Sequence, residues 1–241
     1  LGNMEVFLVV VATAIIQSLF GVGVLLFGTP ILLLLGYPFT EVLLILLPVS
    51  ISINGLQVIY FYRFIDMHIF RNILFITTPF IVISLYFVSK NAINMDILIA
   101  LFLIFIALKG SINVLDVAFN KLLSYNKFFF ILMGIIHGMT NLGGALLTAR
   151  VFCENIDKSK KRVTVAVSYM TFALFQIITI SSFNVQYNFF NLWYVVVGIF
   201  VYFFTSRIIF SSISEDKYKD IFTLFLAVLG ILLLVKRMIS W

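Results

Sequence analysis

Long apolar stretches alternate with short polar segments along the whole chain. Most of these stretches reach about 20 residues, the length at which an α-helix crosses roughly 30 Å of hydrocarbon. The predicted spans are 40–62, 69–89, 96–115, 162–182, 189–210 and 218–238. The pattern therefore predicts an all-α integral membrane protein, with no soluble domain of useful size left over.

Two further apolar segments are each interrupted by glycine. In the first, an apolar piece reaches Gly21-Val22-Gly23, and a shorter piece follows. In the second, an apolar piece reaches Asn141-Leu142-Gly143-Gly144 before a shorter piece. Glycine adopts backbone conformations that other residues resist, so these are natural places for a helix to end and the chain to turn. Two broken helical segments are predicted, at 6–35 and 128–153.

The second half of the sequence repeats the first at a constant offset, without a gap. Gly23 matches Gly143, which gives 143 − 23 = 120, and Asp96 matches Asp216 at the same offset. Chance similarity between apolar segments explains poorly why both halves break and restart at equivalent residues. Two repeats are predicted, 1–120 and 121–241, within one membrane domain. Internal repeats of this kind are typical of secondary transporters.

The direction of the broken segments decides the topology. If each crosses the membrane once, the repeats are parallel; if each turns back, each repeat is a re-entrant hairpin plus three transmembrane helices, and the repeats are inverted. Lys and Arg concentrate in short cytoplasmic loops. The single-crossing model divides the 16 basic residues seven to nine, whereas the hairpin model places thirteen on one side and three on the other. Inverted repeats are therefore predicted, with both termini outside the cytoplasm.

Composition narrows the class further. The chain is 63% hydrophobic and 11% charged, well below the roughly 25% charged residues of soluble proteins. Its net charge of +6 comes from loop residues that form no continuous basic face, so nucleic acid is not an expected partner. A single cysteine, Cys153, excludes an intrachain disulfide, and no Cys/His cluster has metal spacing. Neither a metal nor another cofactor is expected.

Two hairpins that enter from opposite leaflets would bring their glycine tips together near the membrane midplane. A short helix begins at each tip, and a helix N-terminus offers free N–H groups and a positive dipole end, which favour an anion. Uncharged hydroxyl and amide side chains nearby suit a dehydrated oxyanion, although such residues also pack membrane helices together. Ser18, Ser52, Gln57 and Thr148 are among the polar residues of these segments. The predicted substrate-binding residues are Gly21, Gly23, Thr29, Ser50, Asn54, Thr140, Asn141, Gly143, Gly144, Ser168, Thr171 and Gln176.

Three residues are candidates for coupling or gating. His137 aligns with Gln17, one turn before the tip, and is the only titratable group expected near the midplane. It is a candidate carrier of a coupling proton, and a neutral histidine that bonds a neighbouring helix is an equal alternative. Arg150 lies six residues after Gly144. It either guides anions into the cavity or extends to the lipid headgroups.

At the two tips the sequence resembles the sulfite exporter TauE/SafE family, whose members carry a Gly-rich segment leading to a proline near the start of each half. The matching segments here are 21–30 and 143–150. The resemblance implies export of sulfite, organosulfonates or related small anions across a bacterial-type cytoplasmic (inner) membrane, driven by a proton or cation gradient. Two positions depart from the family pattern: Val24 replaces a glycine, and Arg150 replaces the second proline.

Two other functions remain open at this point, an anion channel of the same architecture and a non-transport assembly subunit. An intramembrane serine protease needs a nucleophile turn of the G-x-S-x-G type, and the sequence has none. The chain is not expected to be an enzyme. No oligomeric state is predicted.

Overall fold

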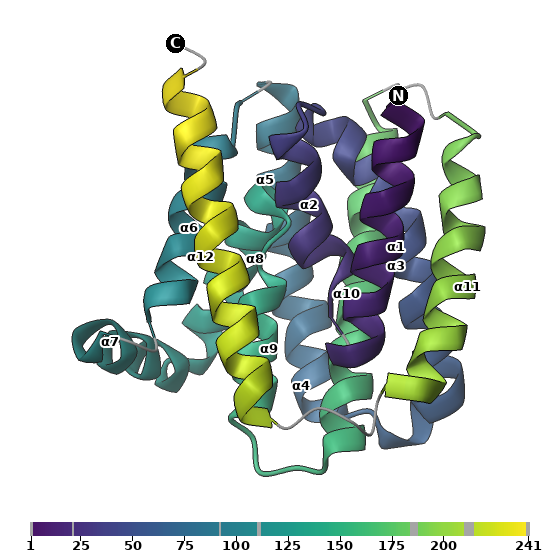
Figure 1. Ribbon diagram of the computed structural model, residues 1–241. Coiled ribbons are helices and arrows are strands. Elements are labelled where there is room, and N and C mark those ends of the chain that lie inside the picture. Colours follow the sequence, from purple (N-terminus) through teal and green to yellow (C-terminus); the bar gives the residue numbers. More distant parts are fainter. Residues whose placement is uncertain are drawn as a thin grey trace.

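The protein is a bundle of helices (Figure 1). The computed structural model describes residues 2–20, 22–91, 93–109, 112–183, 188–209 and 215–239. Gly21, one of the predicted tip residues, lies outside the described residues. The helices are α1 (Gly2–Phe20), α2 (Val24–Leu34), α3 (Phe39–Phe61), η1 (Tyr62–Phe64), α4 (Met67–Asn72), η2 (Ile73–Thr77), α5 (Thr78–Lys90), α6 (Asp96–Leu108), α7 (Asn113–Ser124), α8 (Asn126–Thr140), α9 (Gly144–Phe152), α10 (Lys158–Ser181), α11 (Asn191–Ile209) and α12 (Glu215–Ile239).

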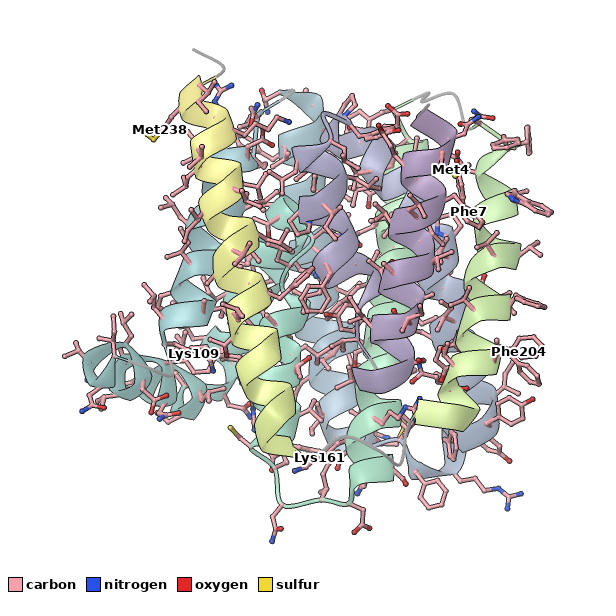
Figure 2. All side chains as sticks on the ribbon, viewed as in Figure 1. Met4, Phe7, Lys109, Lys161, Phe204 and Met238 are labelled. Atoms are coloured by element: carbon pink, nitrogen blue, oxygen red, sulfur yellow. The ribbon has the colours of Figure 1, made fainter. Side chains whose placement is uncertain are left out.

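Length and composition suit the bundle to a membrane. Among the described residues, three helical stretches are long and apolar enough to cross one: Phe39–Phe64, Met67–Lys90 and Ser159–Ser181. Large apolar side chains such as Phe204 and Met238 project outward from its sides, whereas Lys161 lies at one end (Figure 2). An apolar exterior of this extent marks contact with lipid rather than water. The prediction of an all-α membrane protein is confirmed at this level.

Two pairs of antiparallel helices stand where the broken segments were predicted. In Figure 1, α1 runs inward from one end of the bundle and α2 returns toward it, while α8 and α9 do the same from the opposite end. The α8–α9 turn is made by Asn141, whose φ of 62° and ψ of 11° place it in the left-handed region. Its N–H donates to the carbonyl of His137 at 2.7 Å. Asparagine tolerates this conformation better than most residues, which explains its place at the helix end.

In both helix pairs, a glycine at the turn lies against the backbone of the preceding helix. A Cβ added to Gly23 would lie 2.6 Å from the Gln17 nitrogen and 2.7 Å from the Thr13 carbonyl oxygen. A Cβ added to Gly143 would lie 2.7 Å from the Met133 carbonyl oxygen and against His137. Thr13 and Met133 are 120 positions apart, as are Gln17 and His137. Equivalent backbone contacts therefore occur at two glycines 120 positions apart, and only glycine allows either approach.

Packing partners in the two halves also correspond. α1 packs on α11 and its sequence equivalent α8 packs on α5, while α2 packs on α3 and α9 packs on α10. α3 and α10, and likewise α6 and α12, pack on each other. α1 begins and α12 ends at the same end of the bundle (Figure 1).

A small-residue motif that the sequence analysis did not use brings α8 against α5. A Cβ on Gly134 would lie 2.9 Å from the Cβ of Phe80, and one on Gly138 would lie 3.0 Å from the Leu85 nitrogen. The π-helical turn η2 places the Thr77 carbonyl against Gly134. Two glycines four residues apart allow helices in membranes to approach closely. This contact therefore fixes the position of α8 relative to α5.

The predicted span 96–115 differs from the structure. α6 ends at Leu108, and α7 follows at an angle of 102° to it, beside the bundle (Figure 1). α7 is held by Phe119, whose ring packs edge-on against Phe129 of α8 at 6.3 Å between centroids. Lys109 Nζ lies 3.8 Å from the centroid of the Phe119 ring. Since α7 has one polar and one apolar side, it suits a surface position rather than a membrane crossing.

Candidate functional site

A buried chain of polar side chains begins on α3 and ends at the start of α2. Asn54 Nδ2 donates to Ser50 Oγ, and Gln17 Nε2 donates to Asn54 Oδ1, each at 3.0 Å. Gln17 Oε1 then accepts the N–H of Val24, the first residue of α2, at 3.0 Å. All three polar side chains are at most 2% exposed. The α2 N-terminus therefore meets uncharged acceptors and donors, with no carboxylate among them.

A second buried chain surrounds the start of α9 and reaches α2. His137 Nε2 lies 3.3 Å from Gln176 Oε1, and Gln176 Nε2 donates to Asn141 Oδ1 at 3.2 Å. Asn141 Nδ2 donates to Thr29 Oγ1 at 2.8 Å. Because Thr29 belongs to the first half and Asn141 to the second, this bond joins the two halves in the bundle interior.

The amide orientations in this second chain imply one histidine tautomer. With the Gln176 amide nitrogen donating to Asn141, the Gln176 oxygen faces His137, and His137 Nε2 carries the proton in this arrangement. His137 Nδ1 is then an acceptor, and it has no hydrogen-bond partner among the described residues. His137 is fully buried, and the centroid of its ring lies 4.6 Å from the centroid of the Phe172 ring.

Tyr169 is a residue of this site that the sequence analysis missed. A Cβ on Gly144 would lie 2.7 Å from Tyr169 Cε1 and against the tyrosine hydroxyl, so only glycine fits beneath the ring. The Tyr169 and His137 rings meet edge-on at 6.2 Å between centroids. Tyr169 directly follows Ser168, which was predicted as a substrate-binding residue. This neighbour is the feature of the sequence that could have pointed to Tyr169.

Several predicted site residues are placed differently. The hydroxyls of Ser168 and Thr171 bond carbonyl oxygens of their own helix α10, at 2.6 and 2.8 Å. Thr140 Oγ1 bonds the Ile136 carbonyl and accepts the N–H of Leu142, so it supports the turn. The structure thus joins Gln17, Ser50, Asn54, Thr29, Asn141, His137 and Gln176 in two polar chains, while Ser168, Thr171 and Thr140 bond within their own helices or turns.

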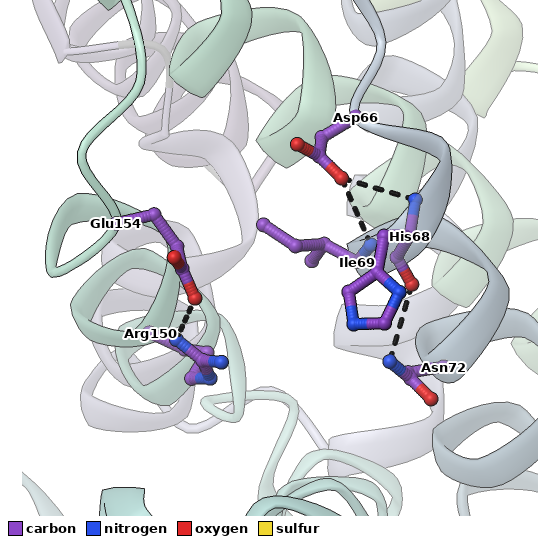
Figure 3. Close-up of polar contacts among 6 residues, drawn as sticks. All are labelled: Asp66, His68, Ile69, Asn72, Arg150 and Glu154. Atoms are coloured by element: carbon purple, nitrogen blue, oxygen red, sulfur yellow. Dashed lines mark hydrogen bonds and ion pairs between the residues drawn. The ribbon is translucent and has the colours of Figure 1, made fainter.

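Arg150 lies outside both polar chains. Its guanidinium pairs with Glu154 one turn further along, where α9 ends (Figure 3). The same view contains Asp66, the N-cap of α4, whose Oδ1 accepts the N–H groups of His68 and Ile69 at 3.0 and 3.1 Å. Both groups belong to the end of the bundle where the α9–α10 loop lies.

Asp66 also ties α4 to the start of α10, through a contact of 3.2 Å with Lys160 Nζ. Burial by itself would raise the pKa of the Asp66 carboxyl. The N–H of Ile69, the Lys160 ammonium and the N–H of His68 outweigh that effect and hold the pKa below its usual range. This carboxylate is therefore ionised at neutral pH and balances one of the nearby lysines.

Two pockets open at opposite ends of the bundle. One of about 350 Å³ lies between the α2–α3 loop and the α5–α6 loop, with Asp96 and Lys236 in its wall. Lys236 Nζ donates to the Leu33 carbonyl near the end of α2, at 2.6 Å. The other, of about 120 Å³, lies between α3 and α10, and its lining includes Gln57 and Arg162. The sequence analysis treated both cations only as indicators of topology.

No group of three or more His, Cys, Asp or Glu side chains gathers among the described residues in a way that would hold a metal ion. The two buried polar chains are made of amides, hydroxyls and one imidazole. Such groups can donate to the oxygens of an anion, and at neutral charge they do not repel one.

Comparison with known proteins gave one match. The model of the family described as Sulfite exporter TauE/SafE matches residues 6–233 of the 241. Among the curated proteins and among the solved structures, no match was found.

Proposed function

Because this chain belongs to the sulfite exporter TauE/SafE family, we propose that it is a secondary transporter that exports small sulfur-containing anions such as sulfite or organosulfonates. Transport would proceed by alternating access around the buried polar chains at the starts of α2 and α9. The family membership carries the coarser conclusion, a membrane transporter of sulfur anions, and the site geometry supports the finer one.

The observation that carries the site assignment is that α2 and α9 both start beside uncharged polar side chains. Each begins beside a glycine contact. The Gln17 amide accepts the first N–H of α2, and the Thr140 hydroxyl accepts the N–H of Leu142, two residues before α9. Helix N-termini stabilise negative charge through their N–H groups and dipole. A small oxyanion would replace hydration with these donors, and the buried residues that the structure describes include no carboxylate to oppose it.

Inverted repeats account for this arrangement. The two helix pairs run inward from opposite ends, and their packing partners correspond (Figure 1). In the orientation we propose, the α9–α10 loop faces the cytoplasm, both termini lie on the other side, and α1–α2 and α8–α9 are re-entrant hairpins. Non-helical backbone at mid-membrane depth is tolerated where protein surrounds it, and the tip residues Val22 and Leu142 are both buried.

The bond between Asn141 and Thr29 supplies a mechanism for alternating access. It joins the turn before α9 to the sixth residue of α2, and we propose that an anion displaces it. A bound anion would take the Asn141 amide donor and leave Thr29 free to move with α2. Opening toward one side and then the other would follow from rocking of the two halves about this point.

His137 is the proposed coupling residue. Its Nδ1 is a buried acceptor without a partner among the described residues. The other ring nitrogen, Nε2, contacts Gln176, the first member of the Gln176–Asn141–Thr29 chain. A proton taken up at Nδ1 would place a positive charge beside the α9 start. Replacement by glutamine, the residue at the equivalent position 17, should abolish the dependence of transport on a proton gradient; transport that keeps this dependence removes His137 from the coupling role.

The main experiment measures uptake of sulfite, sulfate, thiosulfate and a simple organosulfonate into proteoliposomes. Asn141→Gly keeps the left-handed turn but removes the amide, and Thr29→Val keeps the shape but removes the hydroxyl. Asn141→Gly should reduce transport at least about tenfold, the effect of removing a well-made polar contact worth about 1.5 kcal/mol or more. Thr29→Val removes the bond that the anion displaces and leaves the Asn141 donor available, so it should lower the KM for the anion. Thr205→Val is the matched control, because that hydroxyl bonds only carbonyls of its own helix α11.

Three outcomes separate the alternatives. If the wild-type protein moves none of the four anions, the proposed function is wrong. If it moves them but Asn141→Gly and Thr29→Val match the wild type, the site lies elsewhere. If flux is uncoupled from any gradient and reaches channel rates, the protein is an anion channel of the same architecture.

A further inference from the structure

The pocket of about 120 Å³ between α3 and α10 contains an unusual side chain. It is lined by Gln57, Phe61, Ser159, Arg162 and Val163. Arg162 Nε donates to Gln57 Oε1 at 3.3 Å, which fixes the orientation of the glutamine amide. Gln57 Nε2 is then turned away from Arg162, is buried, and meets no acceptor in the part of the chain that the structure describes. A buried donor without a partner is costly, so this one requires an explanation.

The lining groups of this pocket form a donor set for an oxyanion. Arg162 is always charged and recognises planar or tetrahedral oxyanions well. Its Nη2 donates to the Tyr202 hydroxyl at 2.9 Å, which holds the guanidinium in place. Ser159 belongs to the first turn of α10, so a helix N-terminus also faces this region. Within the part of the chain that the structure describes, no carboxylate lines the pocket.

The size of the pocket fits a small ion. Its volume is about four times the roughly 30 Å³ that one water molecule occupies in the liquid. An anion with one central atom and three or four oxygens falls in this range, whereas a bulky organic anion does not.

A buried polar stripe leads from this pocket to the tips. Ser50, Asn54 and Gln57 lie at intervals of four and three residues on α3, and hence on one face of that helix. Asn54 bonds Gln17, which accepts the first N–H of α2. The orphan donor of Gln57 is therefore the first polar group inward from Arg162, in line with the proposed binding site.

The opposite end of the bundle lacks an equivalent. At the repeat offset, Arg162 corresponds to Val42 (162 − 120 = 42) and Gln57 corresponds to Ile177 (57 + 120 = 177). The larger pocket at that end does contain Lys236, but Asp96 shares its wall and balances the charge. Among the described residues, the pocket at the Arg162 end therefore differs from the pocket at the Lys236 end in having no carboxylate in its wall.

We infer that Arg162, Gln57 and Ser159 form a loading site for a small inorganic oxyanion, from which the ion enters the α3 stripe. The site deepens the proposed function and rests on it. In the proposed orientation the loading site faces the cytoplasm, which suits export. Lys161 lies at the same end of the bundle (Figure 2).

The test measures the KM for ³⁵S-labelled sulfite and sulfate separately at each face of the protein, in right-side-out and inverted membrane vesicles. The sole cysteine, Cys153, is exposed in the α9–α10 loop, so labelling by a membrane-impermeant maleimide reports which face is outward. Arg162→Gln should raise the KM at the Arg162 face about tenfold or more, because it removes charge-assisted hydrogen bonds. The KM at the other face should stay within about twofold, since no loading site lies there.

Gln57→Glu distinguishes a loading site from a structural contact. The carboxylate still accepts the Arg162 bond, so the fold is kept, but it turns a negative charge toward the incoming anion. We expect unchanged or higher thermal stability together with a raised KM at the Arg162 face. Lys160→Gln is the matched control: it removes a charge two residues away, and its effect should be small and should disappear at high salt.

Each result is decisive. A KM that is unchanged at the Arg162 face, or raised equally at both faces, in both Arg162→Gln and Gln57→Glu overturns the loading site while the proposed function stands. If Arg162→Gln fails to fold, Gln57→Glu alone decides. Absence of transport by the wild-type protein at either face refutes the proposed function, and the loading site with it.

Discussion

Substitution of Gly143 by alanine tests the helix contact on which the site depends. The added Cβ would lie 2.7 Å from the Met133 carbonyl oxygen and 3.0 Å from His137 Cα. Ordinary contacts between such atoms are about 3.5–4.0 Å, so α9 would have to move away from α8 by about 1 Å. The blocking atoms belong to backbone and to a buried side chain, so neither yields easily.

The expected cost follows from two opposing effects. Overpacking of this kind costs about 1–3 kcal/mol. Alanine also reduces the freedom of the unfolded chain, which returns about 0.4–1 kcal/mol, and the φ of −56° at Gly143 suits alanine. The net loss is about 1–2 kcal/mol, or a fall in Tm of roughly 2–8 °C for a chain of this length.

The assay is thermal unfolding of the detergent-purified protein, followed by intrinsic fluorescence, in parallel with transport in proteoliposomes. Gly55→Ala is the control, because its Cβ would meet only Met170 Sδ at an ordinary 3.7 Å inside helix α3. The control should gain up to about 1 kcal/mol. Gly143→Ala with a Tm equal to or above that of the wild type would refute the close-contact argument, and with it the role of glycine at the tip.

Three further predictions concern the ends of the bundle. Cys153 should react with an impermeant maleimide in inverted membrane vesicles and not in intact cells; the reverse pattern contradicts the proposed orientation. Asp66→Asn keeps the helix cap but loses the Lys160 pair, which is worth about 0–1 kcal/mol. Since the folded-state pKa of Asp66 is lowered, the contribution of this pair is present above about pH 4 and is lost as the pH falls through the folded pKa. The Tm difference between the variant and the wild type should therefore shrink in acid. A Tm difference that stays constant with pH argues against the charge effect. Lys236→Met removes the donor to the Leu33 carbonyl and should lower stability by about 1–2 kcal/mol, whereas Lys236→Arg should retain it; equal stability of all three proteins would show that this bond does not hold α2.

Sequence reasoning located the helices and breaks well because apolar run length is a direct consequence of hydrocarbon thickness. It selected Asn141, Gln176 and His137, which the structure joins in one polar chain. It could not place Tyr169 against Gly144, because this contact joins two helices, and the pattern of residues along each helix does not show which face of one meets which face of the other.

The end of α6 and the contact of Arg162 with Gln57 were missed for related reasons. A count of apolar residues passes over Lys109 and continues to residue 115, although the amphipathic pattern of 113–124 marks a separate helix. Arg162 was counted only among the basic residues that indicate topology. Its partner Gln57, which gives it a further role, is 105 positions away in the sequence. The repeat offset itself contained the clue, because Val42 and Arg162 are equivalent positions with opposite character.

The placement of α7 restricts how the protein can move. In the proposed orientation α7 lies along the membrane surface, and its Phe119 is packed against Phe129 of α8. Vertical displacement of α8 would drag the polar side of α7 into hydrocarbon, at a cost of several kcal/mol. In the proposed mechanism, α8 would thus stay at a constant depth in the membrane. Movement of this helix along the membrane normal would be disfavoured, and the two halves would move relative to each other by tilting.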